Sequence, residues 1–181
     1  MGSWKSRGLR GSFLEEVINL TNEHYRDKNI ALIQKIPTPI TPIEIDKESR
    51  HITLAYFDQK STVDYIGVCQ GLPICFDCKE CAVDTFTLQN VHEHQVKFMQ
   101  DFKKQGGIAF ILIYYTKKSK IYYMRIDELS AFYERAVKGG RKSIRFDELN
   151  ESFLFDVGQS MFINYLEFVN KELELEDSTE N

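Results

Sequence analysis

The sequence predicts an α/β protein in which a mixed central β-sheet is flanked by helices. The strongest observation is the almost wholly apolar run IAFILIYY at 108–115, which is typical of a central strand covered on both faces. Apolar residues repeat at intervals of three and four over 12–29 and 87–104, which indicates amphipathic helices. Because the expected elements follow the order α-β-β-β-β-α-β-β-α-α, they should form one mixed sheet with helices against it.

The N-terminal third is expected to contain a helix followed by a protruding hairpin. Ser12 and Glu15 have the capping-box spacing that closes a helix N-terminus. A strand rich in branched apolar residues follows at 30–36, and the three prolines of PTPITP then exclude a helix or an interior strand. The run RHITLAYF at 50–57 is typical of a second strand. We expect the two strands to form a protruding hairpin, or stalk, at about 35–52.

The remaining helices and strands are predicted from helical repeats of apolar residues and from apolar strand-like runs. Gly106 and Gly107 are expected to end the second helix. The acidic segment 171–181 is expected to fray, so that residues 1–170 form a single domain. The further strands are expected at 64–68, 72–78, 108–115 and 120–126, and the helices at 87–104, 127–137 and about 160–174.

Length and composition favour a cytoplasmic protein with one core. The chain has 181 residues and is 43% hydrophobic, which suits one compact domain. No apolar run approaches the ~18 residues that a membrane span needs, and the N-terminus lacks an apolar signal segment. The four cysteines cluster at 69, 75, 78 and 81, unlike the dispersed framework of a secreted disulfide protein, so reduced thiols are expected.

The distribution of charge matters more than its sum. The formal net charge is -4, and the acidic segment 171–181 accounts for it, so the remaining residues are neutral overall. Basic residues cluster at 5–10, 117–120 and 138–145. Such clusters are common on solvated surfaces, but their local fields can also bind phosphates. Arg141 and Lys142 in the last cluster are therefore candidate DNA contacts.

The stretch ICFDCKEC at 74–81 allows two interpretations. The spacing C-x-x-C-x-x-C is that of thiol ligands for zinc or an iron–sulfur centre, whereas D-C-K places an acid and a lysine two apart. Side chains alternate along a strand, so Asp77 and Lys79 share one face while Cys75 and Cys78 point to opposite faces. The thiol interpretation also lacks a second cysteine pair and a tight turn. We therefore favour the acid and the lysine, on a face left open by the core.

Asp64 is the expected partner, because it opens the strand that precedes Asp77. Two carboxylates on adjacent strands can hold a divalent ion through oxygen ligands, as Mg²⁺ prefers. The ion would polarise a scissile phosphate and activate a water, while Lys79 would offset charge in the transition state. D…DxK triplets are frequent in surface strands, so this spacing alone is a weak indication.

The wider pattern resembles one nuclease family. The order of Glu15, Asp64 and Asp77-x-Lys79 is similar to that of PD-(D/E)XK nucleases. The chain as a whole resembles the RecU-type Holliday junction resolvases of that superfamily. The matching segments are RGSFLEEVINLTNEHY (10–25), KIPTP (35–39), AYFDQKSTVDY (55–65), FDCKE (76–80), LQNVHEHQ (88–95) and GRKSIRFDEL (140–149).

The resemblance implies a restriction-endonuclease-like core and a role for each matching residue. Asp64, Asp77 and Glu15 would hold the metal, and Lys79 would be the catalytic lysine. Arg10 would contact DNA and modulate a recombinase. The remaining matches are Lys35 and Arg50, which would be stalk contacts, and Gln89, which would face the site.

The resemblance also implies how the protein would act. It would use Mg²⁺, with Mn²⁺ able to substitute, to hydrolyse phosphodiesters at a four-way DNA junction. A homodimer would place one site on each of two like strands, since symmetric nicking needs a two-fold assembly. The stalk would enter the junction and recognise its shape. A recombinase is a further expected partner, and no membrane is involved.

Three alternatives remain open from the sequence. Asp77 stands where this family usually has Glu, and Val63 where a polar Thr commonly precedes the first Asp. The protein could therefore be a branched-DNA or recombinase-binding protein whose nuclease activity is weak or lost. The cysteines could instead make it a metal or redox sensor. A nuclease of the same superfamily acting on plain duplex DNA is the third alternative.

Overall fold

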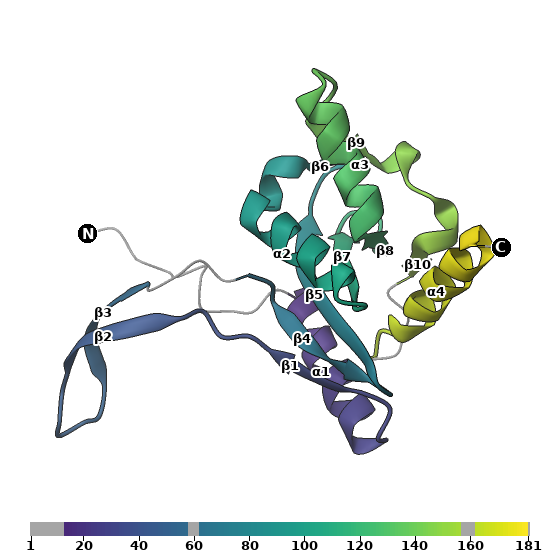
Figure 1. Ribbon diagram of the computed structural model, residues 1–181. Helices are drawn as coiled ribbons and strands as arrows, with labels where there is room; N and C mark the ends of the chain where they lie inside the picture. The colour runs from purple at the N-terminus through teal and green to yellow at the C-terminus, as the bar shows by residue number, and fades with distance from the viewer. Residues whose placement is uncertain (1–12, 58–61, 157–161, 181) are drawn as a thin grey trace.

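The computed structural model describes residues 13–57, 62–156 and 162–180, and it shows a mixed sheet flanked by helices, as the sequence predicts (Figure 1). The six-stranded sheet has the order β1-β4-β5-β7-β8-β10. Its central neighbours β5 and β7 run parallel, and every other neighbouring pair runs antiparallel. The strands are β1 (Leu32–Lys35), β4 (Tyr65–Cys69), β5 (Leu72–Cys81), β7 (Ile108–Tyr115), β8 (Lys120–Arg125) and β10 (Leu154–Asp156).

Helices cover both faces of this sheet. The helices are α1 (Phe13–Asp27), α2 (Glu93–Lys104), α3 (Ile126–Val137) and α4 (Leu166–Glu180). One face carries a row of stacked rings from neighbouring strands, with Phe76 between Tyr65 and Phe110 at centroid distances of 4.8 Å. Helices α1 and α4 pack on this aromatic face, while α2 and α3 cover the other. The apolar strand β7 is buried on both sides, as expected.

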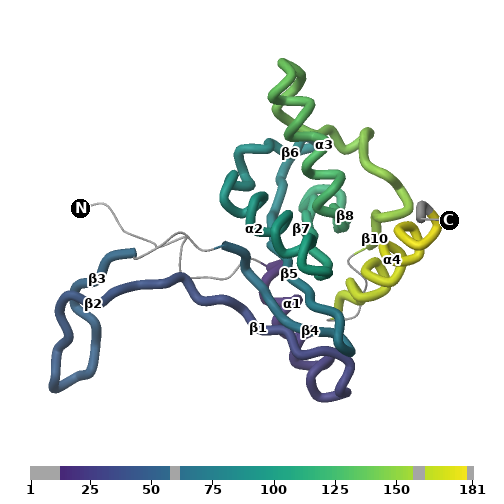
Figure 2. Tube along the Cα trace, in the orientation of Figure 1, coloured from purple at the N-terminus to yellow at the C-terminus, as the bar shows by residue number. Residues whose placement is uncertain are grey.

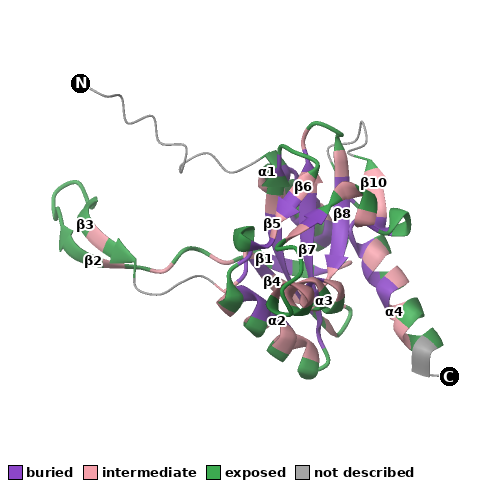
Figure 3. Ribbon diagram, turned by 90° about the horizontal axis from the view of Figure 1, so that it is seen from above, coloured by how far each residue is buried: buried purple, intermediate pink, exposed green. Residues whose placement is uncertain are grey.

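The protruding hairpin is present, but its strands differ from those predicted. β2 (Ile40–Ile45) pairs with β3 (Ile52–Phe57) in a separate two-stranded sheet that projects from the core (Figure 2). β1 instead pairs with β4 in the main sheet, because its Ile33 is buried in the core. The proline segment itself supplies β2. Proline has no backbone N–H, and in a two-stranded hairpin Pro42 can occupy an edge position where no N–H has to donate to a neighbouring strand. Figure 3 shows the hairpin as largely exposed and the central strands as buried.

Two predicted helices have different ends. The segment 87–104 is divided into β6 (Thr85–Thr87), the 3₁₀ helix η1 (Leu88–Asn90) and α2, with the extended residue His92 as N-cap of α2. β6 pairs with the short strand β9 (Ser143–Arg145). The 3₁₀ turns η2 (Phe146–Glu148) and η3 (Glu151–Phe153) lead from β9 to β10.

The last helix begins later and runs further than predicted, to Glu180. The expectation that 171–181 frays is wrong for its first part, because Glu172 is buried and accepts a hydrogen bond from the Tyr123 hydroxyl at 2.6 Å. Glu176 also forms an ion pair with Lys103. Among the described residues, no helix is long and apolar enough to span a membrane.

Candidate active site

Asp64 and Asp77 lie opposite each other at the open end of the β4–β5 pair. Tyr65 on β4 is registered with Phe76 on β5, so the next positions along the antiparallel pair are Asp64 and Asp77. The backbone N–H of Cys78 donates to Asp64 Oδ2 at 2.9 Å, which fixes the first carboxylate against the second strand. Two carboxylates therefore meet on one side of the sheet.

Lys79 forms an ion pair with Asp77 on the same face of β5. The expectation that this face is open is wrong for Asp77, whose side chain is 0% exposed because α2 lies over it. Burial, followed by the charge of Asp64, raises the pKa of Asp77 to about 7, and Lys79 opposes this shift. Near neutral pH the Asp77 carboxyl can therefore gain or lose a proton readily, and a bound divalent cation would favour its ionised form.

Gln95 is a site residue that the sequence interpretation missed. Its Nε2 donates to Asp77 Oδ1 at 3.0 Å from the first turn of α2. Its Oε1 accepts from the backbone N–H of His92 at 3.1 Å, which makes Gln95 part of a capping box. The sequence signal for it is weak, because a capping box normally has Ser, Thr, Asp or Asn at the N-cap, and His92 occupies that position here.

Glu15 lies in the first turn of α1, on the aromatic side of the sheet, and its carboxylate forms an ion pair with Lys35. The backbone N–H of Leu14 donates to Glu80 Oε1 at 3.1 Å, so the first turn of α1 is attached to β5 beside Lys79. The charges of all three predicted ligands add to burial in raising the pKa of the Cys78 thiol well above its usual range. Glu15 therefore acts on Cys78 of β5, whereas the pKa of Asp77 responds to burial, Asp64 and Lys79.

The donor set is compatible with a hard divalent ion. Carboxylate and amide oxygens suit Mg²⁺. Asp77 Oδ2 is buried and forms an ion pair with Lys79, and the Asp64 carboxyl lies within hydrogen-bond range of the Asp77 carboxyl. However, the described residues contain no group of three His, Cys, Asp or Glu side chains arranged to hold a metal. The structure thus brings Asp64 and Asp77 together and leaves Glu15 paired with Lys35.

All four cysteines are free, and Cys75, Cys78 and Cys81 are buried. Cys75 and Cys78 lie on opposite faces of β5, which pairs in unbroken register with β7 over 74–81. The Cys81 thiol donates to the Val83 carbonyl at 3.0 Å. Their surroundings are those of small core residues.

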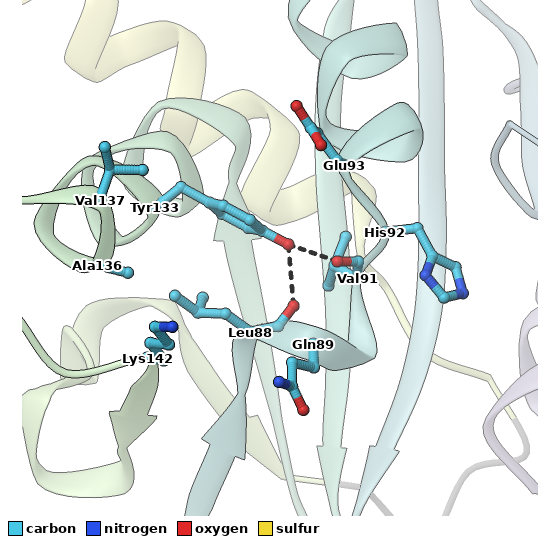
Figure 4. A pocket seen from close by; sticks show the side chains of 9 residues that line it. All are labelled: Leu88, Gln89, Val91, His92, Glu93, Tyr133, Ala136, Val137 and Lys142. Atoms are coloured by element: carbon cyan, nitrogen blue, oxygen red, sulfur yellow. Dashed lines mark hydrogen bonds between the residues drawn. The ribbon is translucent and has the colours of Figure 1, made fainter.

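The predicted DNA-contact residues fall into separate places. Arg50 lies in the turn of the hairpin, and Arg141 forms an ion pair with Glu148 at 2.7 Å. Gln89 and Lys142 line one hollow beside α2, and neither Asp64 nor Asp77 is among the residues that line it (Figure 4). Arg10 lies outside the described residues.

A mixed sheet that carries two facing aspartates and a lysine is the arrangement of metal-dependent nucleases. The family described as "RecU: Recombination protein U" matches residues 9–171, and the chain belongs to this family. Curated relatives named Holliday junction resolvase RecU are similar to it over most of its length. The one from Geobacillus sp. (strain WCH70) is 40% identical over 169 residues, which are 91% of this chain and 84% of the relative. The Bacillus subtilis (strain 168) protein is 38% identical over 167 residues, or 90% and 80% of the two chains.

A solved structure was also found to be similar. It is that of Archaeoglobus fulgidus Hjc, described as a Holliday junction resolvase from an archaeal hyperthermophile. It covers 81% of this chain and 93% of its own, with a TM-score of 0.45 and 9% sequence identity. The family assignment rests on the sequence matches.

Proposed function

We propose that this protein is a Mg²⁺-dependent endonuclease that resolves four-way DNA junctions by paired symmetric nicks in homologous recombination and repair. The observation that carries the proposal is Asp64 facing Asp77, with Lys79 bound to Asp77 on the same face. The names of the relatives, Holliday junction resolvase RecU, support the substrate class. Work on chromosomal DNA would place the protein in the cytoplasm.

Each residue of the site is proposed to have a separate role in phosphodiester hydrolysis. Asp64 and Asp77 would hold the metal, with Glu15 completing the acidic site once its contact with Lys35 is released. The ion would supply Lewis-acid polarisation of the scissile phosphate and a bound water of lowered pKa. Lys79, released from Asp77 as the cation enters, would stabilise the negative charge that develops on the phosphoryl oxygens. Gln95 would keep the Asp77 carboxylate in position throughout.

DNA recognition is assigned to residues outside this site. The projecting hairpin would select branched DNA by shape, with Arg50 near its tip and Lys35 near its base. Arg10, Arg141 and Lys142 would contact phosphates. Each protomer offers one acidic site, so paired nicks require a homodimer. A recombinase is proposed as an additional partner of Arg10.

The decisive experiment is the Asp77→Asn variant in a junction-cleavage assay with and without Mg²⁺. Loss of one carboxylate ligand should abolish nicking while junction binding remains. The matched control is Asp101→Asn, since Asp101 is a surface aspartate on α2 that pairs with Lys104. Cutting by Asp77→Asn at the parental rate would show that the assigned site is wrong. Parallel reactions on junction, duplex and flap DNA identify the preferred substrate.

A second candidate function is junction binding without efficient cleavage. It is favoured by the burial of Asp77, both of whose oxygens already have partners in Gln95 and Lys79. Asp77 also has a ligand arm one methylene shorter than Glu. Gel shifts with no nicking across a Mg²⁺ and Mn²⁺ titration would support this function.

Metal analysis of the protein purified without chelator tests the remaining alternative, a thiolate metal site. Zinc or iron that is lost on replacing Cys75 and Cys78 would assign such a site.

A further inference from the structure

A hollow of about 570 Å³ lies beside the acidic site, between η1, the start of α2, the end of α3 and the segment before β9. We call it the η1–α3 hollow. Its size is within the range of sites that hold small ligands. Tyr133 forms part of its wall, and its single hydroxyl proton is shared between the carbonyls of Leu88, at 2.9 Å from the hydroxyl oxygen, and Val91 (Figure 4). These bonds fix the ring, so the wall is preformed.

The hollow has an apolar side and a basic side. Ala136 and Val137 lie on the α3 side with Tyr133, and Lys142 lies below Ala136 in the view, on the segment before β9 (Figure 4). Val137 is 86% exposed, so its side chain is accessible to a ligand in the hollow. No described carboxylate lies within ion-pair distance of Lys142, whereas the neighbouring Arg141 is held by Glu148.

The hollow is connected to the acidic site through two hydrogen bonds. His92, in the wall of the hollow, donates its backbone N–H to Gln95 Oε1, and Gln95 Nε2 donates to Asp77 Oδ1. The backbone N–H of Leu88 also donates to the Lys142 carbonyl at 3.2 Å, which anchors the basic segment to η1. The N-terminal turn of α2 therefore connects the wall of the hollow to the buried Asp77.

We propose that the η1–α3 hollow holds one nucleotide of a junction strand next to the scissile phosphate. Lys142 contacts its phosphate, and the apolar wall of Tyr133, Ala136 and Val137 packs against its sugar or base. A nucleotide combines an anionic group with an apolar face, which matches the two sides of the hollow. Glu93 contributes the carboxylate of the lining and points away from Lys142 in Figure 4. This inference rests on the proposed junction-binding function.

The test measures the binding of a four-way junction by fluorescence anisotropy over a range of salt concentrations, in the Asp77→Asn background so that no cutting occurs. Val137→Asp introduces a carboxylate at an exposed position of the apolar wall and should weaken binding roughly tenfold. Lys142→Ala removes one phosphate contact and should reduce the salt slope by about 1. Thermal unfolding should be unchanged in both variants, because both side chains are exposed.

Two matched controls carry the same charge changes elsewhere. Val83→Asp adds a carboxylate at another exposed valine, and Lys104→Ala removes a lysine at the far end of α2. Both controls should bind like the background protein. If Val137→Asp and Lys142→Ala also bind like it, the nucleotide site is wrong and the junction-binding function still stands. That result would also be expected if the hollow were a docking site for a protein. If the background protein binds no junction, the proposed function and this inference fail together.

Discussion

Gln95 on α2 holds the buried Asp77 of β5 through a hydrogen bond of 3.0 Å from its Nε2 to Asp77 Oδ1. The same amide closes the helix N-terminus, because its Oε1 accepts the backbone N–H of His92. One side chain thus links the position of α2 to the position of a proposed metal ligand. Outer-shell hydrogen bonds of this kind orient metal ligands and tune their basicity.

Replacing Gln95 with Ala should lower the junction-nicking rate by about 10–100-fold, since Asp77 loses the donor that positions it. The free energy of unfolding should also fall by about 1–3 kcal/mol, because a buried acceptor is left without its donor. A Mg²⁺ titration of the rate separates positioning from simple destabilisation, because positioning predicts a higher Mg²⁺ requirement at a temperature where both proteins are folded. Gln100→Ala is the control: Gln100 lies on the same helix and donates to Ser130 Oγ at 2.8 Å. A parental Mg²⁺ requirement in Gln95→Ala would exclude the positioning role.

The stability of the metal-free protein should depend on pH through Asp77. Its pKa is raised from 3.8 to about 7, so the folded state holds a proton that the unfolded chain has already released. The contribution of Asp77 to the free energy of unfolding is therefore present below 3.8 and is lost as pH rises to about 7. Bound Mg²⁺ favours the ionised carboxylate and should reverse the loss.

Urea unfolding of the parent and of Asp77→Asn, across this pH range with and without Mg²⁺, measures the effect. The difference between the two proteins is the relevant quantity, because Glu172 has a pKa raised by burial to about 7 and adds a contribution of the same sign in both. Identical pH dependence in the two proteins would mean that Asp77 ionises normally in the folded state.

The local arrangement on β5 could be predicted from the sequence, because side-chain alternation depends only on the backbone of one strand. Asp77 and Lys79 share a face, and Phe76 lies in the aromatic row on the other. The cover over that face could not be predicted in the same way. It depends on where α2 packs. The prediction that the Asp77 face of β5 is open was wrong because Gln95 and the rest of α2 bury Asp77.

The hairpin shows the same limit for strand pairing. Branched apolar residues predicted strands near 30–36 and 50–57, and both segments contain strands. The choice of partner, however, is set by contacts between residues far apart in the chain. Ile33 fits the core beside β4, so β1 joins the main sheet and leaves β3 to pair with the proline segment.

The end of α4 should be required for stability. Glu172 is 1% exposed and accepts from the Tyr123 hydroxyl on β8, so a chain ending at Asn170 leaves a buried hydroxyl without its acceptor and removes the ion pair of Glu176. We expect the free energy of unfolding to fall by more than about 2 kcal/mol. A chain ending at Asp177 retains both contacts and should unfold like the parent. Equal thermal midpoints for the two truncations would restore the interpretation of 171–181 as a frayed tail.

Arg50 offers a way to separate charge from backbone strain in the hairpin. It has a φ of 57° in the turn between β2 and β3, a conformation that glycine adopts without the steric cost that a Cβ imposes. Arg50→Gly and Arg50→Ala lose the same cation, so both should weaken junction binding equally if the guanidinium contacts phosphate. They should differ in the order of the turn, with protease cleavage between β2 and β3 faster for Arg50→Ala because alanine retains the strain of about 1 kcal/mol. Unequal binding that follows the cleavage rates would instead assign the effect to hairpin shape.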